Sequence, residues 1–410
     1  MGVNSRTTVA PDADTAPSAA AVILADLLEA YHTVAPERLA DLIAEAAAKG
    51  GASACTLYLQ DYDQQVLVPL PSALGEAGEL PIDASVAGQV FADEQEREEP
   101  GDGGVRLWLL MLDGTDRLGV LGATVAPADD GARWLCRRLA SLAALFLVSK
   151  GENSDHFFWT RRHQPMTLPA EMQWQLLPAL TVRTPRVAIA GVLEPAYSVG
   201  GDAFDYAING DVAHVAIVDS MGHGLDASDM AAVTVGSYRH SRRQQLGLAA
   251  THDAMDAVLA RQFGDDRFAT VQLAELDLES GQLSLINAGH PPPLLVQGRG
   301  KARPVPCEPA LPVGIRSGAI PPVTTLQLSP GDRVLFFTDG VVENRLPDGE
   351  HFGDERLRVA FAEGCAAGRT AAETVRRLAA AFLDVHGGRT RDDATLILLE
   401  WRGAEEARPR

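Results

Sequence analysis

The sequence predicts a layered α/β domain in its carboxy-terminal half, preceded by a smaller α+β domain and a helical linker. In the carboxy-terminal half, strand patterns alternate with helical patterns. Residues 215–218 and 334–337 are continuously apolar, which indicates strands buried on both faces. In the amino-terminal part, two helical segments precede two pairs of strands. The chain has 410 residues, 46% of them hydrophobic, and this length and composition favour two or three globular domains.

The amino-terminal α+β domain is predicted to span residues 21–150. Its apolar residues recur first at helical spacing and then in short strand-like runs. The predicted elements are two helices within 21–50, strand pairs at 55–59 with 66–68 and at 105–111 with 118–125, a charged solvated loop at 93–102, and a closing helix at 133–150. Residues 1–20 contain Asp12 and Asp14 and no lysine, and we expect them to form a disordered tail.

A helical linker is predicted for residues 151–180, with breaks around residues 151–155 and at Pro165 and Pro169. The helix that precedes it carries an apolar stripe, which suits either an intramolecular core face or a parallel coiled-coil seam between two chains. The residues of this stripe are Leu135, Leu139, Leu142, Ala143 and Phe146. A parallel helical connector favours a homodimer.

The larger α/β domain is predicted to span residues 181–402, followed by a short tail at 403–410. Its strands and helices are read from apolar runs and from helical periodicity. The strands are expected at 187–192, 212–218, 269–278, 282–287, 333–337 and 394–400, and the helices at 226–243, 251–263, 353–362 and 370–385. Several buried strands with intervening helices predict stacked sheets.

Charge and composition exclude several classes of protein. The 55 acidic and 35 basic residues give a formal charge of −20, which repels phosphate backbones and anionic membranes, so we expect neither nucleic-acid binding nor membrane association. The longest apolar run has ten residues, about half of the roughly 20 that a membrane-spanning helix requires. The first 20 residues lack the pattern of a signal peptide. The four cysteines lie far apart in the sequence, which favours reduced thiols over disulfides. We therefore expect a cytoplasmic protein.

Four aspartates occur where a predicted buried strand meets a turn: Asp202, Asp219, Asp339 and Asp392. Any one of them alone is commonly a turn former or a helix cap. However, Asp219 and Asp339 follow their strands whereas Asp392 precedes its own. If the last strand runs antiparallel to the other two, the three carboxylates meet at one rim. Clustered carboxylates repel unless a cation neutralises them, and hard oxygen ligands suit Mg²⁺ or Mn²⁺.

Five ordered motifs resemble the metal-dependent protein phosphatase family of type 2C (PPM), in its bacterial SpoIIE/RsbU-like branch. The resemblance covers about Glu171 to Glu400. The motifs are V199-G-G-D-A-F-D205, D219-S-M-G-H-G224, N287-A-G-H-P-P-P-L-L295, F337-T-D-G-V-V-E343 and D392-D-A-T-L-I-L398, after the linker ending Q173-W-Q-L-L-P178. The family implies a β-sandwich flanked by helices, in α-β-β-α order. The element order of residues 21–150 and the phrase R117-L-G-V-L121 resemble a GAF sensor domain, the alternative being an undefined α+β dimerisation module.

The resemblance implies a site with two Mn²⁺ or Mg²⁺ ions. Asp219 would bridge them, Asp339 and Asp392 would complete the ligands of one ion, and the Ser220 carbonyl and Asp202, directly or through water, would serve the other. Asp219, Asp339 and Asp392 are then the catalytic set, and Asp393 a supporting or turn residue. The family implies direct hydroxide attack on protein phosphoserine or phosphothreonine, and this branch commonly acts on phosphorylated STAS-domain anti-anti-sigma factors, under sensor control.

Other interpretations of these residues stay open at this point. His223 is either a general acid or a loop-holding residue, and His290 is expected to pack in a turn near the site. Three arginines are candidates for holding phosphate, namely Arg183, Arg186 and Arg391. Gly200 to Phe204 echoes the GGDEF motif of diguanylate cyclases, but Ala203 stands where that motif needs glutamate. A catalytically inactive phosphatase-fold scaffold that binds a regulatory partner is the remaining alternative.

Overall fold

The computed structural model describes residues 18–198, 200–264, 266–316, 318–343, 353–385 and 393–403. Asp392, most of the predicted amino-terminal tail and nearly all of the predicted carboxy-terminal tail lie outside these residues. The end of the amino-terminal tail is corrected, because helix α1 (Ala19–Tyr31) already begins at Ala19, with the Ser18 hydroxyl accepting a hydrogen bond from the Ala21 N–H at 3.2 Å. No helix in these described ranges is long and apolar enough to cross a bilayer.

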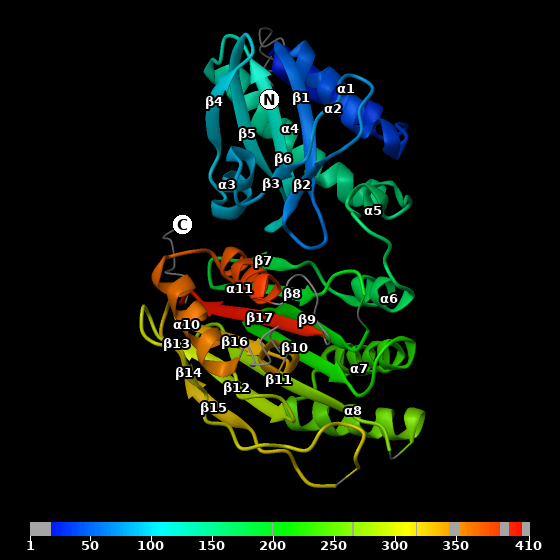
Figure 1. Cartoon of the computed structure of the whole chain (residues 1–410), viewed down its shortest axis with the longest axis vertical. Helices are drawn as coiled ribbons and strands as arrows, with labels where there is room; N and C mark the ends of the chain where they lie inside the picture. The colour runs from blue at the N-terminus through cyan, green and yellow to red at the C-terminus, as the bar shows by residue number, and fades with distance from the viewer. Residues whose placement is uncertain are drawn as a thin grey trace, which may run out of the picture.

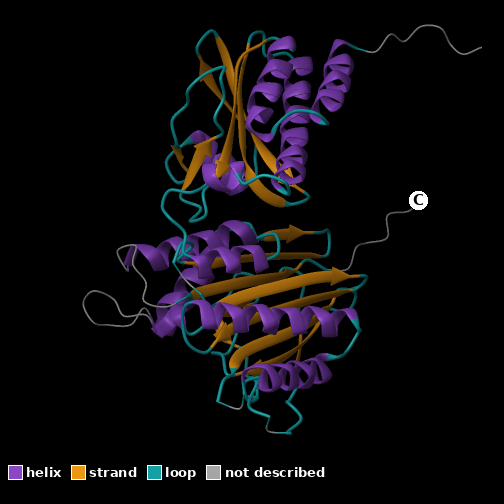
Figure 2. Ribbon diagram, turned by 90° about the vertical axis from the view of Figure 1, so that its right-hand side faces the viewer, coloured by secondary structure: helices purple, strands orange, loops and turns teal. Residues whose placement is uncertain are grey.

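The amino-terminal part is one antiparallel sheet covered on one face by three helices, α1, α2 (Leu39–Lys49) and α4 (Asp130–Gly151) (Figures 1 and 2). The strand order is β3-β2-β1-β6-β5-β4. The strands are β1 (Ala52–Gln60), β2 (Val66–Pro69), β3 (Leu80–Pro81), β4 (Arg97–Gly101), β5 (Gly104–Asp113) and β6 (Asp116–Val125). A short helix α3 (Val86–Asp93) packs on the other face. This is the predicted α+β layout, and its resemblance to a GAF domain stays a prediction.

The charged segment 93–102 is not the solvated loop that we expected, because β4 forms within it and pairs with β5. The charges that suggested a loop have partners on neighbouring elements. Glu98 pairs with Arg133 of α4 at 2.7 Å, and Glu99 accepts a hydrogen bond from the Trp108 indole at 2.7 Å. Cross-element pairing of this kind stabilises an edge strand whose composition alone indicates a loop.

The apolar stripe on α4 belongs to the intramolecular core. Leu135, Leu139, Ala143 and Phe146 are buried against β5, β6 and α2, and Leu142 is half-buried there. Between the two earlier alternatives, the structure therefore favours a core face, and the coiled-coil seam is wrong for this stripe. The homodimer stays a prediction that this stripe no longer supports.

The linker continues from α4 into two short helices, α5 (His156–Thr160) and α6 (Leu168–Leu176). Pro169 does not break the chain as predicted. It occupies the first turn of α6, where a missing N–H is tolerated, and Thr167 caps this turn by accepting a hydrogen bond from the Ala170 N–H. In Figure 1 both helices lie on the right-hand side, α5 beside the lower end of the amino-terminal part and α6 beside the upper end of the carboxy-terminal part.

The carboxy-terminal part contains two stacked antiparallel sheets. One has the order β15-β12-β11-β10-β9 and the other β14-β13-β16-β17-β8-β7. The strands are β7 (Thr181–Arg183), β8 (Val187–Glu194), β9 (Asp202–Asn209), β10 (Val212–Ser220), β11 (Ala269–Asp277), β12 (Gln282–Ala288), β13 (Leu294–Val296), β14 (Arg303–Pro304), β15 (Thr324–Gln327), β16 (Arg333–Phe337) and β17 (Ala394–Trp401). The helices are α7 (Leu225–Arg243), α8 (Leu248–Phe263), α9 (Gly340–Glu343), α10 (Gly353–Ala366) and α11 (Ala371–Val385).

Three buried clusters explain the layers of this part. Phe204, Ile217 and Phe336 belong to the core between the sheets, where Gly191 leaves room for the Phe204 ring. Helices α7 and α8 cover the outer face of the first sheet, and α10 and α11 cover the outer face of the second (Figure 2). The arrangement is helix, sheet, sheet, helix, so the predicted fold class is confirmed. Strands β7, β9 and β15 were not predicted.

A buried ion cluster joins the two parts. Arg117 on β6 and Arg376 on α11 both contact the Glu373 carboxylate, at 3.7 and 2.8 Å, and Arg376 also pairs with Asp83 at 2.5 Å. The side chains of Arg117, Glu373 and Arg376 are only 3 to 5% exposed. Burial favours neutral forms, but the bonds to Arg376 hold the pKa of Glu373 below its ordinary value, so the cluster is ionised.

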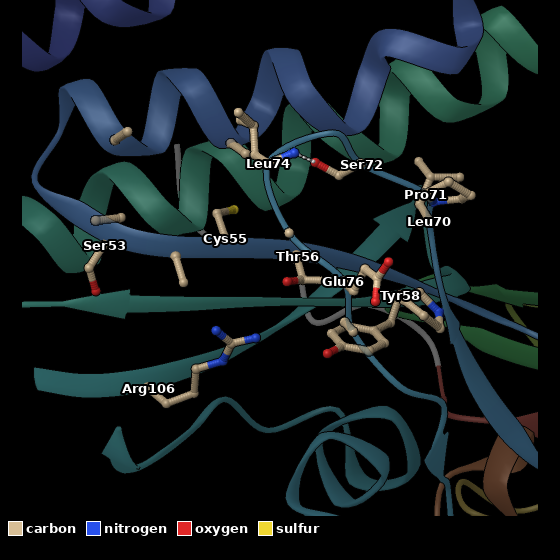
Figure 3. Close-up of a pocket in the computed structure, with 17 residues that line it drawn as sticks. Ser53, Cys55, Thr56, Tyr58, Leu70, Pro71, Ser72, Leu74, Glu76 and Arg106 are labelled. Carbon is tan, nitrogen blue, oxygen red and sulfur yellow. Dashed lines mark hydrogen bonds between the residues drawn. The ribbon is translucent and has the colours of Figure 1, made fainter. Parts of the chain in front are cut away.

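A cavity of about 980 Å³ lies at the edge of the amino-terminal sheet (Figure 3). Strand β2 pairs with β1 only from Tyr58 to Gln60, and the chain after β2 moves away and forms the far wall. Cys55, Thr56, Tyr58, Glu76 and Arg106 are among the residues that line the cavity. Burial raises the pKa of the Cys55 thiol to about 12, so this thiol is protonated at neutral pH. The cavity is separate from the aspartates described next.

Candidate metal centre

The first two aspartates lie side by side on neighbouring strands of one sheet. Asp202 begins β9, Asp219 lies near the end of β10, and the two are direct partners in the antiparallel register. Residues opposite one another in such a pair point to the same face. Ile217, two residues before Asp219, belongs to the core between the sheets, so Asp219 and Asp202 lie on the same inward face at the end of that core.

The other sheet brings its own strand ends to Asp202. Strands β16 and β17 are antiparallel, so the end of β16 lies beside the start of β17. Thr338, before Asp339, and Thr395, after Ala394, donate hydroxyl hydrogen bonds to Asp202 Oδ2 at 2.8 and 2.7 Å. Asp202 therefore joins the two sheets at the rim where β16 ends and β17 begins.

Asp202 is a buried carboxyl group among other carboxyl groups. Only 1% of the residue is exposed. Burial, followed by the charges of Asp219 and Asp393, raises its pKa well above the ordinary value, although the two threonine hydroxyls oppose this shift. Carboxyl groups crowded at a buried rim form the kind of environment in which a hard divalent cation is stabilised.

The described residues account for four of the five predicted metal ligands. Asp202, Asp219 and Ser220 come from the paired ends of β9 and β10, and Asp339 follows the threonine that bonds Asp202. Within the described ranges, no three Asp, Glu, His or Cys side chains are close enough to hold a metal ion. Asp392, the fifth predicted ligand, lies outside those ranges. The available donors are hard oxygens, so their chemistry fits Mg²⁺ or Mn²⁺, and the ligand set stays a prediction.

Small residues permit the close approach of chain segments at this rim. The Ser220 N–H donates to the Gly201 carbonyl at 3.1 Å, and a Cβ at Gly201 would lie 3.2 Å from the Ser220 oxygen. Gly222 and Gly224 have φ values of 103° and 69°, which other residues rarely adopt. The Ser220 hydroxyl is buried and has no hydrogen-bond partner among the described residues. The turn after β10 therefore needs its glycines.

The two histidines of the motifs have different environments. His223 is exposed in the turn after β10. His290 is buried, and burial lowers its pKa to about 4, so the ring is neutral at pH 7. Its Nε2 lies 3.4 Å from the Thr270 hydroxyl, which donates to the Asp219 carbonyl at 3.4 Å. His290 is thus a packing residue beside the site, as predicted, and the role of His223 stays open.

The candidate arginines do not converge on the aspartates. Arg183 pairs with Glu94 at 2.9 Å, and Arg186 pairs with Asp211 at 2.7 Å. Arg391 lies outside the described residues. Both described arginines are therefore engaged elsewhere, and a role in holding phosphate is not supported for them.

Three residues that the sequence analysis did not single out contact the site, namely Thr338, Thr395 and Gln173. Thr338 lies between the end of β16 and Asp339, and Thr395 is the second residue of β17, two positions after Asp393. A threonine close to an aspartate at each of these strand ends was the available signal. Gln173 comes from α6, outside the sandwich, and donates to the Asp202 carbonyl at 2.6 Å. No spacing rule in the sequence indicates that contact.

Comparison with known protein families agrees with this geometry. Residues 209–402 match the family model described as Stage II sporulation protein E (SpoIIE). The matching segment includes Asp219, Ser220, Asp339 and Asp392, whereas Asp202 lies before it. This segment, just under half of the chain, is therefore a SpoIIE-type domain. The predicted SpoIIE-like branch is thus confirmed for this domain.

Individual relatives of the SpoIIE-type domain are more distant. Protein IcfG of Synechocystis sp. is 29% identical over 265 residues, which cover 57% of this chain and 39% of the relative, so the match spans less than half of that protein. The RsbU and RsbW domains of Rv1364c from Mycobacterium tuberculosis are 27% identical, with a TM-score of 0.47, over 54% of this chain and 63% of that chain.

A second solved structure contains the PP2C phosphatase domain and a regulatory fragment of SpoIIE from Bacillus subtilis. It is 19% identical, with a TM-score of 0.46, and the overlay covers 53% of this chain and 64% of that chain. These overlays are partial, and the family assignment rests on the sequence match of residues 209–402.

Proposed function

We propose that the SpoIIE-type domain is a metal-dependent protein phosphatase that hydrolyses phosphoserine and phosphothreonine. One observation carries the proposal. Asp202, which is buried and crowded by carboxyl charge, and the half-buried Asp219 lie as a pair at the sheet rim where Asp339 also begins its turn, inside or beside a segment that matches the SpoIIE family model. A rim of this kind offers the hard oxygen ligands that divalent cations of phosphoryl transfer prefer.

In this proposal Asp219, Asp339 and Asp392 hold two Mn²⁺ or Mg²⁺ ions, with Asp202 and the Ser220 carbonyl as further ligands. When bound, such a pair supplies a water of lowered pKa and positive charge for the phosphoryl oxygens. Thr338 and Thr395 fix the carboxylate of Asp202. The exposed residues Met221, Gly222 and His223 of the turn after β10 leave the rim accessible to a phosphoprotein.

The proposed substrate is a phosphorylated STAS-domain anti-anti-sigma protein, by analogy with this branch of the family.

We also propose that the amino-terminal part, as a GAF-like sensor, controls the rate of hydrolysis. Its support is the cluster of the buried Arg117, Glu373 and Arg376 with the exposed Asp83, which connects the amino-terminal sheet to α11. Replacing Asp83 with alanine removes its ion pairs with Arg376 and Arg377 and is expected to change the hydrolysis rate. An unchanged rate would contradict control through this contact.

The test of the catalytic proposal is hydrolysis of para-nitrophenyl phosphate and of a phosphoserine STAS protein by the full-length chain, with Mn²⁺, with Mg²⁺ or with chelator. Asp219→Asn is expected to lower kcat by roughly 100-fold or more, because a predicted bridging ligand loses its charge. Asp229→Asn, an exposed position on α7, is the matched control and should leave kcat unchanged. Metal-independent turnover, or full activity of Asp219→Asn, would refute the proposal. Tight partner binding without turnover would favour the inactive scaffold.

A further inference from the structure

Helix α6 of the linker reaches directly into the aspartate rim through one side chain. Gln173 is 1% exposed, and its Nε2 donates to the Asp202 carbonyl at 2.6 Å and to Asp393 Oδ2 at 3.4 Å. The same Asp393 oxygen accepts the Asp202 N–H at 3.1 Å. The carbonyl and the N–H of Asp202 are therefore held from outside the sheet by Gln173 and Asp393.

This arrangement compensates for a weakness of the local chain. Asp202 follows Gly200 and Gly201, which have large conformational freedom and need external contacts to fix the backbone. The start of α6 also packs closely here, since a Cβ at Gly200 would lie 2.6 Å from the Pro169 ring. Substituting the amide of Gln173 would leave the buried Asp202 carbonyl without this partner.

We propose that Gln173 is a positioning residue of the metal centre, which holds Asp202 opposite Asp219 and fixes Asp393 as a support. The inference rests on the proposed function, because it concerns the geometry that the ions require. It assigns the two neighbouring aspartates different roles. Asp393 is turned toward the Asp202 N–H and Gln173, which leaves the predicted role of metal ligand to Asp392. Supporting contacts of metal ligands contribute strongly to metal affinity.

The position of Gln173 depends in turn on the amino-terminal part. The adjacent Trp174 donates its indole N–H to the Ala196 carbonyl at 2.8 Å and packs against Tyr62, with ring centroids 4.7 Å apart in an edge-on arrangement. Tyr62 belongs to the turn between β1 and β2 and is buried there. The aromatic contact therefore gives the sensor sheet a physical connection to the helix that holds Asp202.

The experiment measures Mn²⁺ binding to the full-length chain by electron paramagnetic resonance of free Mn²⁺, beside kcat and the KM for para-nitrophenyl phosphate. Gln173→Met keeps the length of the side chain and removes its hydrogen bonds. We expect the Kd for Mn²⁺ to rise about 10- to 100-fold, while the metal-free chain still folds and its melting temperature falls by only a few degrees. Gln175→Met, an exposed position on the same helix, is the matched control and should bind Mn²⁺ as wild type does.

Gln173→Asn, which retains the amide but shortens its reach, carries the same expectation if Gln173→Met does not fold. At saturating Mn²⁺, kcat should return toward the wild-type value while the KM for the ester stays similar, which a general loss of structure would not produce. Wild-type Mn²⁺ affinity in both Gln173 variants, with active wild type, overturns this inference alone. A wild-type chain that neither binds Mn²⁺ nor hydrolyses the ester overturns the proposed function with it.

Discussion

Replacing Glu373 with glutamine removes the negative charge at the centre of the buried cluster between the two parts of the chain. Glu373 bonds Arg376 twice, at 2.8 and 2.9 Å, and Arg377 at 2.6 Å, and it lies 3.7 Å from Arg117. The substitution leaves the guanidinium groups of Arg117 and Arg376 buried next to an amide. Removing one partner of a buried ion pair typically destabilises a protein by about 3–5 kcal/mol.

The lower end of that range applies here. Arg376 keeps its contacts with Asp83 at 2.5 Å and with the Gln64 carbonyl at 3.3 Å, and Arg117 keeps its bond to the Phe91 carbonyl at 3.0 Å. We therefore expect a loss of about 3 kcal/mol, which corresponds to a decrease in Tm of roughly 6–12 °C for a domain of this size.

Differential scanning calorimetry of the full-length chain at pH 7 measures this effect, because the two parts need not unfold in one step. Glu363→Gln, an exposed position on α10, is the matched control and should shift Tm by no more than about 2 °C. The pKa of Glu373 is held below its ordinary value, so its stabilisation is present above the unfolded pKa and is lost as pH falls through the folded pKa. The difference between wild type and Glu373→Gln should thus shrink in acid. A Tm shift below 2 °C at pH 7 would refute this account of the cluster.

Two further substitutions test the sandwich. Asp205 pairs with Arg239 and with the largely buried Arg242, each at 2.7 Å, and Asp205→Asn removes the carboxylate from both pairs. The free energy of unfolding, measured in urea, should fall by about 3 kcal/mol. A loss below about 1 kcal/mol would contradict this expectation. His290→Gln should flatten the pH dependence of stability between 6.5 and about 4. The buried His290 ring stays neutral in the folded state, whereas in the unfolded chain it takes up a proton below about pH 6.5. The wild type therefore loses roughly 3 kcal/mol of stability as the pH falls from 6.5 to about 4. An unchanged pH profile in His290→Gln would contradict this account.

The strand patterns of the sequence predicted the sandwich well because its central strands are apolar on both faces. The runs at 215–218 and 334–337 lie in β10 and β16, and the aspartates that follow them lie at the ends of those strands. Asp339 can lie near the start of the last strand only if β16 and β17 are antiparallel, and the structure shows this pairing. Periodicity and turn position were sufficient for these elements.

The missed elements depend on tertiary contacts rather than on local pattern. The apolar pattern of strand β9 is interrupted by two buried acids, Asp202 and Asp205, and the partners that permit their burial lie on other elements. Strand β4 contains Glu98 and Glu99, whose partners also lie on other elements. The role of Gln173 follows only from the docking of α6, since no feature within the linker indicates a contact with Asp202. The α4 stripe had the right periodicity, but periodicity alone does not identify its partner.

The most direct test of the central claim is anomalous diffraction at the manganese edge from crystals of the full-length chain grown with Mn²⁺. Two manganese peaks about 3.5–4 Å apart, between the ends of β10, β16 and β17 and touching Asp219, are the predicted result. A fully ordered rim without manganese, with the ions bound elsewhere or nowhere, would contradict the claim that these aspartates form a binuclear metal centre.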